Sequence, residues 1–133
     1  MPRYRQNMNF LLGGVAIGII IFQSAVIAPV IAKTLEPPFN GQVLRSLWPK
    51  FFLFIAVLGA ATLASLDFGD EGSTAHYVIA GATTLFAVVC YAIIPATNRA
   101  TDEGNQKLFN VLHKMSVYLT VAMLLLNIAY PFA

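Results

Sequence analysis

The stretch "FLLGGVAIGIIIFQSAVIAPVIA", residues 10–32, decides the fold class of this 133-residue chain. All of its 23 residues except Gln23 and Ser24 are apolar or small. At 1.5 Å per residue such a helix is about 35 Å long, enough to cross a hydrocarbon core about 30 Å thick with some tilt. The apolar part of a signal peptide has only about 7–15 residues, so we expect a retained membrane-spanning helix, bent near its end by Pro29.

Three further apolar runs follow, over residues 51–66, 77–94 and 115–133, and short polar connections separate them. With their flanking residues they predict spans over about residues 9–33, 44–66, 76–95 and 108–131. The chain is 58% hydrophobic and 11% charged, whereas a soluble domain is about 25% charged. We therefore predict an all-α, integral membrane four-helix bundle, a single domain over residues 1–133 with the lipid bilayer as its surroundings.

The distribution of Lys and Arg predicts the orientation, because these residues concentrate on the cytoplasmic side of a membrane. The two termini and the second connection share one side, which carries only Arg3 and Arg5 and the acidic Asp67, Asp70 and Glu71. The other side carries six basic residues: Lys33, Arg45, Lys50, Arg99, Lys107 and Lys114. We predict that both termini lie outside and that the first and third connections lie in the cytoplasm.

Several function classes have no support in the sequence. The chain has no HExxH, CxxC, phosphate-loop or serine-nucleophile motif, and this favours a non-enzymatic protein without catalytic residues or a metal site. Its net charge of +2, with no basic run, indicates that it has no nucleic-acid partner. Its single cysteine, Cys90, lies in an apolar run and is expected to be a packing residue.

Small residues recur at the spacing that brings membrane helices together. Gly14 and Gly18 form a GxxxG pair in the first span, and Ala56, Ala60 and Ala64 repeat the spacing in the second. Such stripes allow two helix backbones to approach closely. We predict packing faces at both stripes.

The stretch "PATNRATDEGNQKLFNVLHKMS", residues 95–116, is the most polar part of the chain. Asn98 and His113 in this stretch, and Lys50 just before the second apolar run, fall near the level where hydrocarbon meets headgroups, and Gln23 is a further candidate. One interpretation makes them interface residues whose polar ends reach toward water. The other makes them an inward-facing polar cluster, because ionisable residues at membrane depth are costly and tend to mark functional sites.

The second interpretation leads to a specific geometry. Pro95 should bend or end the third helix, since proline lacks an amide hydrogen. His113 should then lie within hydrogen-bonding reach of Asn98 or Lys50, directly or through one water or ligand.

His113 is also the candidate ligand for a cofactor. The other histidine, His76, begins the third span on the opposite side, roughly one membrane thickness away. The two histidines therefore cannot both bind one haem iron within a protomer. A haem or metal ion would need His113 together with another ligand, such as Lys50 or water.

Three segments resemble a known family: "TLEPPFNGQVLRSLWPKFF" (34–52), "IIPATNRATDE" (93–103) and "LFNVLHKMS" (108–116). They are similar to the transmembrane-protein-205-like family, catalogued in bacteria as a domain of unknown function, and the likeness covers nearly the whole chain. It implies a four-helix protein of the bacterial inner membrane and distant kinship with small histidine-bearing families, some of which bind haem or copper. It implies no activity. The family pattern falls on Gly41, Leu47, Pro49, Phe52, Pro95, Asn98, His113 and Ser116, and it leaves the role of Lys50 open.

Three functions are consistent with these features. The first is a non-enzymatic accessory or scaffold subunit of a homo-oligomer or a larger membrane complex. The second is a transporter or channel for a small solute or ion, which would require dimerisation because four helices enclose little room. The third is a haem- or metal-binding redox protein that uses His113.

Overall fold

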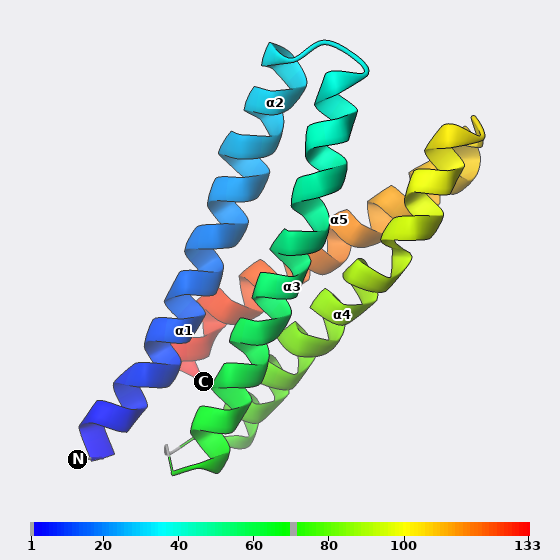
Figure 1. Ribbon diagram of the computed structural model, residues 1–133. Helices are drawn as coiled ribbons and strands as arrows, with labels where there is room; N and C mark the ends of the chain where they lie inside the picture. The colour runs from blue at the N-terminus through cyan, green and yellow to red at the C-terminus, as the bar shows by residue number, and fades with distance from the viewer. Residues whose placement is uncertain (1, 70–71) are drawn as a thin grey trace.

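The computed structural model describes the backbone of residues 2–69 and 72–133 and the side chains of residues 8–69 and 72–133. The predicted acidic residues Asp70 and Glu71, and the side chains of Arg3 and Arg5, lie outside the described part. Throughout the described residues the elements are helical (Figure 1).

Four long helical rods form the molecule. The first joins α1 (Pro2–Phe22), a π-helical segment η1 (Gln23–Ile27) and α2 (Ala28–Thr34). The others are α3 (Phe39–Asp67), α4 (Thr74–Asp102) and α5 (Gln106–Ala129), the last closed by a 3-10 turn η2 (Tyr130–Phe132). Each rod is long and apolar enough to span a membrane, with a mean hydropathy between 1.6 and 2.4. The predicted all-α four-helix bundle is confirmed, and the chain is an integral membrane protein.

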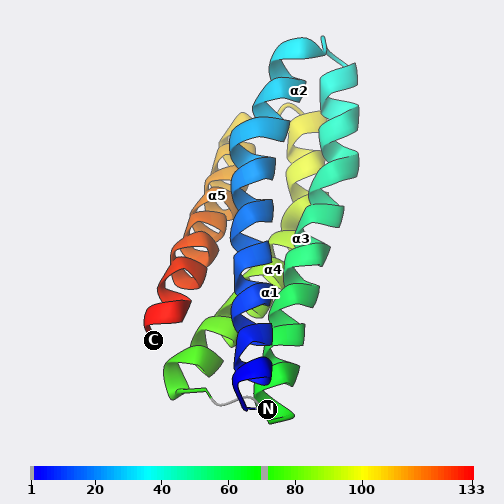
Figure 2. The ribbon, with the colours of Figure 1, turned by 90° about the vertical axis from the view of Figure 1, so that its left-hand side faces the viewer.

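The helices pack as a ring in which α1 meets α3, α3 meets α4, α4 meets α5, and α5 returns to α1. Figure 2 shows α1 between α3 and α5. The N-terminus and the C-terminus lie at the same end of the bundle (Figure 1). We call this end the terminal end, and we call the opposite end, which carries the first and third connections, the basic end.

Pro29 is accommodated by a change of helix type. Proline has no N–H to donate to the carbonyl four residues earlier, and its ring crowds that carbonyl. In the turn before Pro29 the N–H of Ala28 donates to the carbonyl of Gln23, five residues back. A wider π-helical turn therefore carries the chain past the proline.

Of the two outcomes expected at Pro95, a bend or an end of the helix, the end is wrong, because α4 continues to Asp102. Threonine hydroxyls bond to backbone carbonyls around the proline: Thr97 donates to Ile93 O at 2.9 Å and Thr101 to Thr97 O at 3.2 Å. The helix ends only at Gly104, which has a φ of +71°. There the N–H of Asn105 donates to Ala100 O at 2.8 Å, a Schellman closure that places glycine just after the helix.

At the basic end α3 and α4 extend beyond the predicted spans, which stay predictions. Helices α3 and α4 have 29 residues each, about 44 Å at 1.5 Å per residue. A hydrocarbon core is about 30 Å thick, so several helical turns extend beyond it. Apolar runs cannot reveal these turns, because they lie among headgroups and water.

The centre of the bundle is apolar and closely packed. Its buried members come from all four rods: Ala16, Ile20, Phe51, Phe52, Ile55, Ala87, Cys90 and Met123. Toward the terminal end, Gly59 of α3 lies against α4. A Cβ atom at Gly59 would come within 3.0 Å of the backbone nitrogen of Thr84 and 3.3 Å of Ala80 O. Glycine is therefore needed at this contact between α3 and α4.

We predict that Gly59→Ala lowers the free energy of unfolding by about 1–3 kcal/mol, the usual cost of overpacking. Gly81→Ala is the matched control, because a Cβ atom at Gly81 in α4 would meet nothing within 4 Å. Alanine favours a helix over glycine by up to about 1 kcal/mol, so the control should be neutral or stabilising. Thermal unfolding in mild detergent, followed by circular dichroism, measures both, and equal midpoints for the two variants would contradict the close approach.

Candidate functional site

Lys50 lies on the outside of α3. Its ammonium donates to Ser46 Oγ at 3.2 Å and to Ser46 O at 3.5 Å, one turn nearer the basic end. The side chain is exposed. Lys50 therefore reaches along its own helix toward the basic end.

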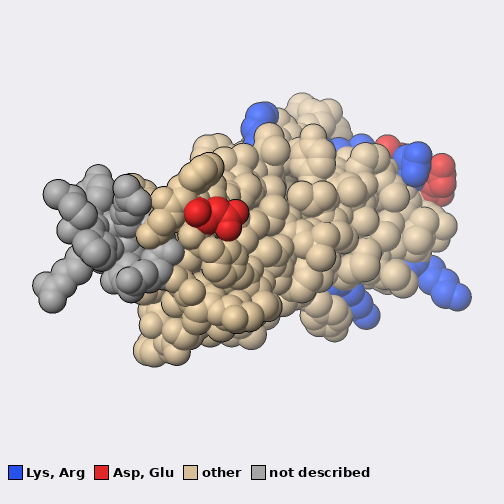
Figure 3. Space-filling model, turned by 90° about the horizontal axis from the view of Figure 1, so that it is seen from below, with Lys and Arg blue, Asp and Glu red and all other residues tan. Residues whose placement is uncertain are grey.

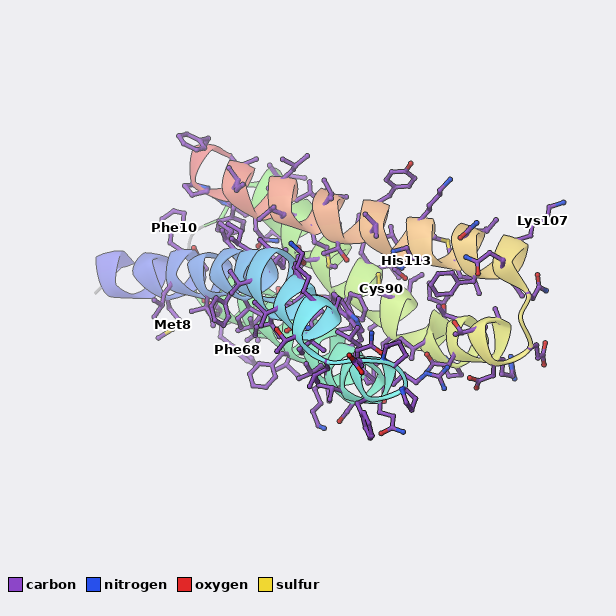
Figure 4. The ribbon with its side chains drawn as sticks, turned by 90° about the horizontal axis from the view of Figure 1, so that it is seen from above. Met8, Phe10, Phe68, Cys90, Lys107 and His113 are labelled. Atoms are coloured by element: carbon purple, nitrogen blue, oxygen red, sulfur yellow. The ribbon has the colours of Figure 1, made fainter. Side chains whose placement is uncertain are left out.

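His113 and Asn98 lie on neighbouring helices but have different partners. The exposed His113 ring stacks on Phe109, with ring centroids 5.3 Å apart and 9° between the planes. Figure 4 shows His113 partway along α5 and Lys107 at its start. The backbone carbonyl of Asn98 accepts from Arg45 Nη2 at 3.5 Å, and Arg45 also forms an ion pair with Asp102. Arg45 thus links α3 to the last turns of α4.

Gln23 differs from the other three residues because it is buried, with 6% of its surface exposed. Its Nε2 has no hydrogen-bond partner among the described atoms. Within the described part of the chain, no hydrogen bond joins any two of Gln23, Lys50, Asn98 and His113. The direct contact expected for His113 is not present, and a contact through water or a ligand stays a prediction.

The candidate cofactor ligand is a single exposed imidazole. His76 lies at the terminal end, so His113 would be the one histidine ligand of a haem bound to one protomer. Among the described residues, no group of three or more His, Cys, Asp or Glu side chains could hold a metal ion.

A second polar cluster, which the sequence analysis did not identify, is buried toward the terminal end. Asn127 of α5 donates from Nδ2 to Thr83 Oγ1 of α4 at 3.0 Å and to Met123 O at 2.8 Å. Thr83 in turn donates to Ile79 O at 2.8 Å. Asn127 and Thr83 expose only 6% and 2% of their surfaces. This side-chain bond therefore fastens α5 to α4 inside the bundle.

His76 belongs to the same end and has both ring nitrogens engaged. The N–H of Ser73 donates to Nδ1 at 3.0 Å, so Nδ1 carries no hydrogen. The proton is then on Nε2, which donates to Tyr130 O at 3.0 Å. Phe10 of α1 contacts both rings edge-on, with centroids 6.2 Å from His76 and 5.8 Å from Tyr130. His76 thus joins the start of α4 to the final turn of the chain.

A small cavity lies beside these groups, at the centre of the four helical rods. It encloses about 10 Å³ and is lined by Leu12, Gly13, Ala16, Leu58, Gly59, Thr62, Ala80, Thr83, Asn127 and Tyr130. That volume is close to the minimum for one water molecule. The lining has hydroxyl and amide groups but no carboxylate or ammonium group. This end of the bundle is therefore suited to holding the helices together rather than to acid–base chemistry.

One signal in the sequence could have pointed to this cluster. Thr83 and Asn127 interrupt apolar runs near the terminal end, and polar residues inside a span usually face the protein interior. Nothing in the sequence, however, shows that residues 44 positions apart form a hydrogen bond.

Comparison with known proteins shows a family that covers most of the chain. The model of a protein family described as "Domain of unknown function (DUF4149)" matches residues 11–106. The match includes Gln23, Lys50, Asn98, His76 and Thr83, and it ends before His113 and Asn127. No curated protein and no solved structure matches the chain.

We predict that Asn127 and Thr83 are energetically coupled. In a double-mutant cycle with Asn127→Ala and Thr83→Ala, the coupling should be about 0.5–1.5 kcal/mol, as for hydrogen bonds between membrane helices. Thr97→Ala is the control partner, since Thr97 bonds only to its own helix at the basic end. Unfolding in detergent measures the cycle, and additive effects for the Asn127–Thr83 pair would show that the bond contributes nothing.

Proposed function

The chain belongs to the family described as Domain of unknown function (DUF4149), and because that description names no activity, we propose a function from the geometry. The protein is a non-enzymatic accessory or scaffold subunit that associates with a second copy of itself or with a larger membrane complex. It does so through a helix face that its own fold leaves uncovered. The resemblance of its polar connections to the transmembrane-protein-205-like family is part of this proposal.

The observation that carries the proposal is the environment of Gly14 and Gly18. A Cβ atom at either position would meet nothing within 4 Å. Both glycines lie on the side of α1 opposite its buried residues Ala16 and Ile20. A GxxxG pair directed away from the bundle is suited to close contact with a helix from another molecule.

Gly59 provides the contrast within the same chain. Its missing side chain is needed for contact between α3 and α4, whereas Gly14 and Gly18 have no such role inside the protomer. In Figure 2, one side of α1 faces away from α3, α4 and α5. Ala60 and Ala64 of the second small-residue stripe are also exposed.

The packing of the interior favours association over solute passage through one protomer. The cavity between the four rods has about 10 Å³ of space, about that of a single water molecule. A transported solute would need a path formed between protomers. Association is therefore required by the second function as well, and it is the property to test first.

We predict that Gly14→Ile with Gly18→Ile shifts the purified protein from oligomer to monomer, because two β-branched side chains keep the helix backbones apart. Light scattering coupled to size-exclusion chromatography in mild detergent gives the mass. The expected change is at least a tenfold weaker association.

Gly81→Ile is the matched control. Its Cβ position is equally open, but Leu85 stands four residues later in place of a second glycine. The control should keep the wild-type mass. A wild-type protein that is monomeric at all concentrations, or a double variant that stays oligomeric, would contradict association through α1.

The proposed location is the bacterial inner membrane, with both termini outside. In a Cys90→Ala background, an impermeant thiol reagent added to intact cells should label Phe68→Cys and spare Glu103→Cys. Phe68 is 82% exposed and Glu103 is exposed at the opposite end of α4. The reverse labelling would show that Arg3 and Arg5 determine the orientation.

A further inference from the structure

Two exposed lysines, Lys50 on α3 and Lys114 on α5, lie at similar distances along their helices from the terminal end. Seventeen residues separate Lys50 from Asp67, the last residue of α3, which is about 26 Å along a helix. Eighteen separate Lys114 from Phe132, the end of η2, or about 27 Å. Both distances fall just short of the roughly 30 Å hydrocarbon core. If Asp67 and Phe132 each lie at the membrane interface of the terminal end, the Cα atoms of both lysines lie inside the hydrocarbon, close to its boundary at the basic end.

Below each lysine lies a strip of apolar side chains facing outward. Below Lys50 on α3 the strip consists of Leu53, Phe54 and Val57, which are 54%, 62% and 58% exposed. Below Lys114 on α5, Val117, Tyr118 and Val121 are 42%, 69% and 45% exposed. In both strips the spacing is three, four and seven residues from the lysine, so each lysine and its strip share one face.

The charge of these lysines is not compensated inside the protein. The ion pair found between described side chains joins Arg45 to Asp102 and leaves both lysines without a carboxylate. Lys50 reaches toward the basic end to bond to Ser46, which places its ammonium nearer the headgroups than its own backbone. On the face in Figure 3, the charged side chains are few and broad uncharged surfaces lie between them.

We propose that Lys50 and Lys114 each bind the phosphate of an anionic phospholipid in the leaflet at the basic end. The acyl chains of that lipid lie along the apolar strip below the lysine. The lipid phosphate supplies a negative counter-charge for each ammonium. The strip below the lysine supplies an apolar surface along which the acyl chains can lie. The protein thus has two equivalent lipid sites, on α3 and α5, which do not depend on the proposed self-association.

The experiment uses the full chain in a neutral mild detergent, with phosphatidylglycerol, phosphatidylcholine or inorganic phosphate added at equal concentration. Native mass spectrometry counts retained lipids, and thermal unfolding gives the change in midpoint. We expect about two retained phosphatidylglycerol molecules per protomer and a rise of several degrees in the midpoint, because a ligand that binds only the folded state stabilises it. Phosphatidylcholine and inorganic phosphate should have little effect.

Lysine variants distinguish lipid binding at the two sites from general attraction of anionic lipid to the positively charged end of the protein. Lys50→Gln with Lys114→Gln should lose most of the retained phosphatidylglycerol, and the two Lys→Arg changes should keep it. Lys33→Gln with Lys107→Gln is the control, since it removes the same charge from the tips of α2 and α5 at the same end. This control should retain the lipid.

Several results would overturn the proposal. One is equal retention of phosphatidylglycerol and phosphatidylcholine. Another is full retention of phosphatidylglycerol by the Lys50→Gln, Lys114→Gln variant, and a third is an equal loss of phosphatidylglycerol in the Lys33→Gln, Lys107→Gln control. Stabilisation by inorganic phosphate to the same extent would indicate a site for the free anion instead of a lipid. If the double variant does not fold, each single variant should lose about one retained lipid, and wild-type retention in both would overturn the assignment.

Discussion

One constraint underlies this structure: inside the hydrocarbon, every backbone amide and carbonyl needs a hydrogen-bond partner within the protein. It forces the chain into helices, and it explains how the helices treat their prolines. At Pro29 the chain widens into a π-helical turn, and α4 continues through Pro95 to Asp102. The polypeptide stops being helical only near the ends of the rods, at positions such as Gly104.

Lipid also changes what holds the helices to one another. Apolar side chains gain little by leaving hydrocarbon for a protein interior, so close backbone contact and buried hydrogen bonds become more important. Gly59 provides the first and the Asn127–Thr83 bond provides the second. The two features lie toward the terminal end with His76, while toward the basic end α5 lies beside α4 and apart from α2 (Figure 1). The terminal end is thus the more firmly fastened part of the bundle.

Hydropathy predicted the number and type of helices, since four long apolar runs have no other stable arrangement. It did not predict where α3 begins or where α4 ends, because turns among headgroups have no apolar pattern and a glycine closure decides the last residue of α4. It grouped Lys50 with His113 by depth alone. Depth does not determine the face of a helix, and Lys50 is exposed on α3 beside outward-facing apolar residues. The Asn127–Thr83 bond escaped detection because it joins distant segments.

The contact between α1 and α5 closes the ring of helices with the first and the last rod of the chain. During synthesis at a ribosome, α1 enters the membrane well before α5 has been made. The inward residues of the first rod, among them Gln23 of η1, must meanwhile face lipid, the insertion machinery or another protein. Completion of this bundle is therefore a late event in biogenesis, and a chain stalled before α5 would present an open flank to the quality-control proteases of the membrane.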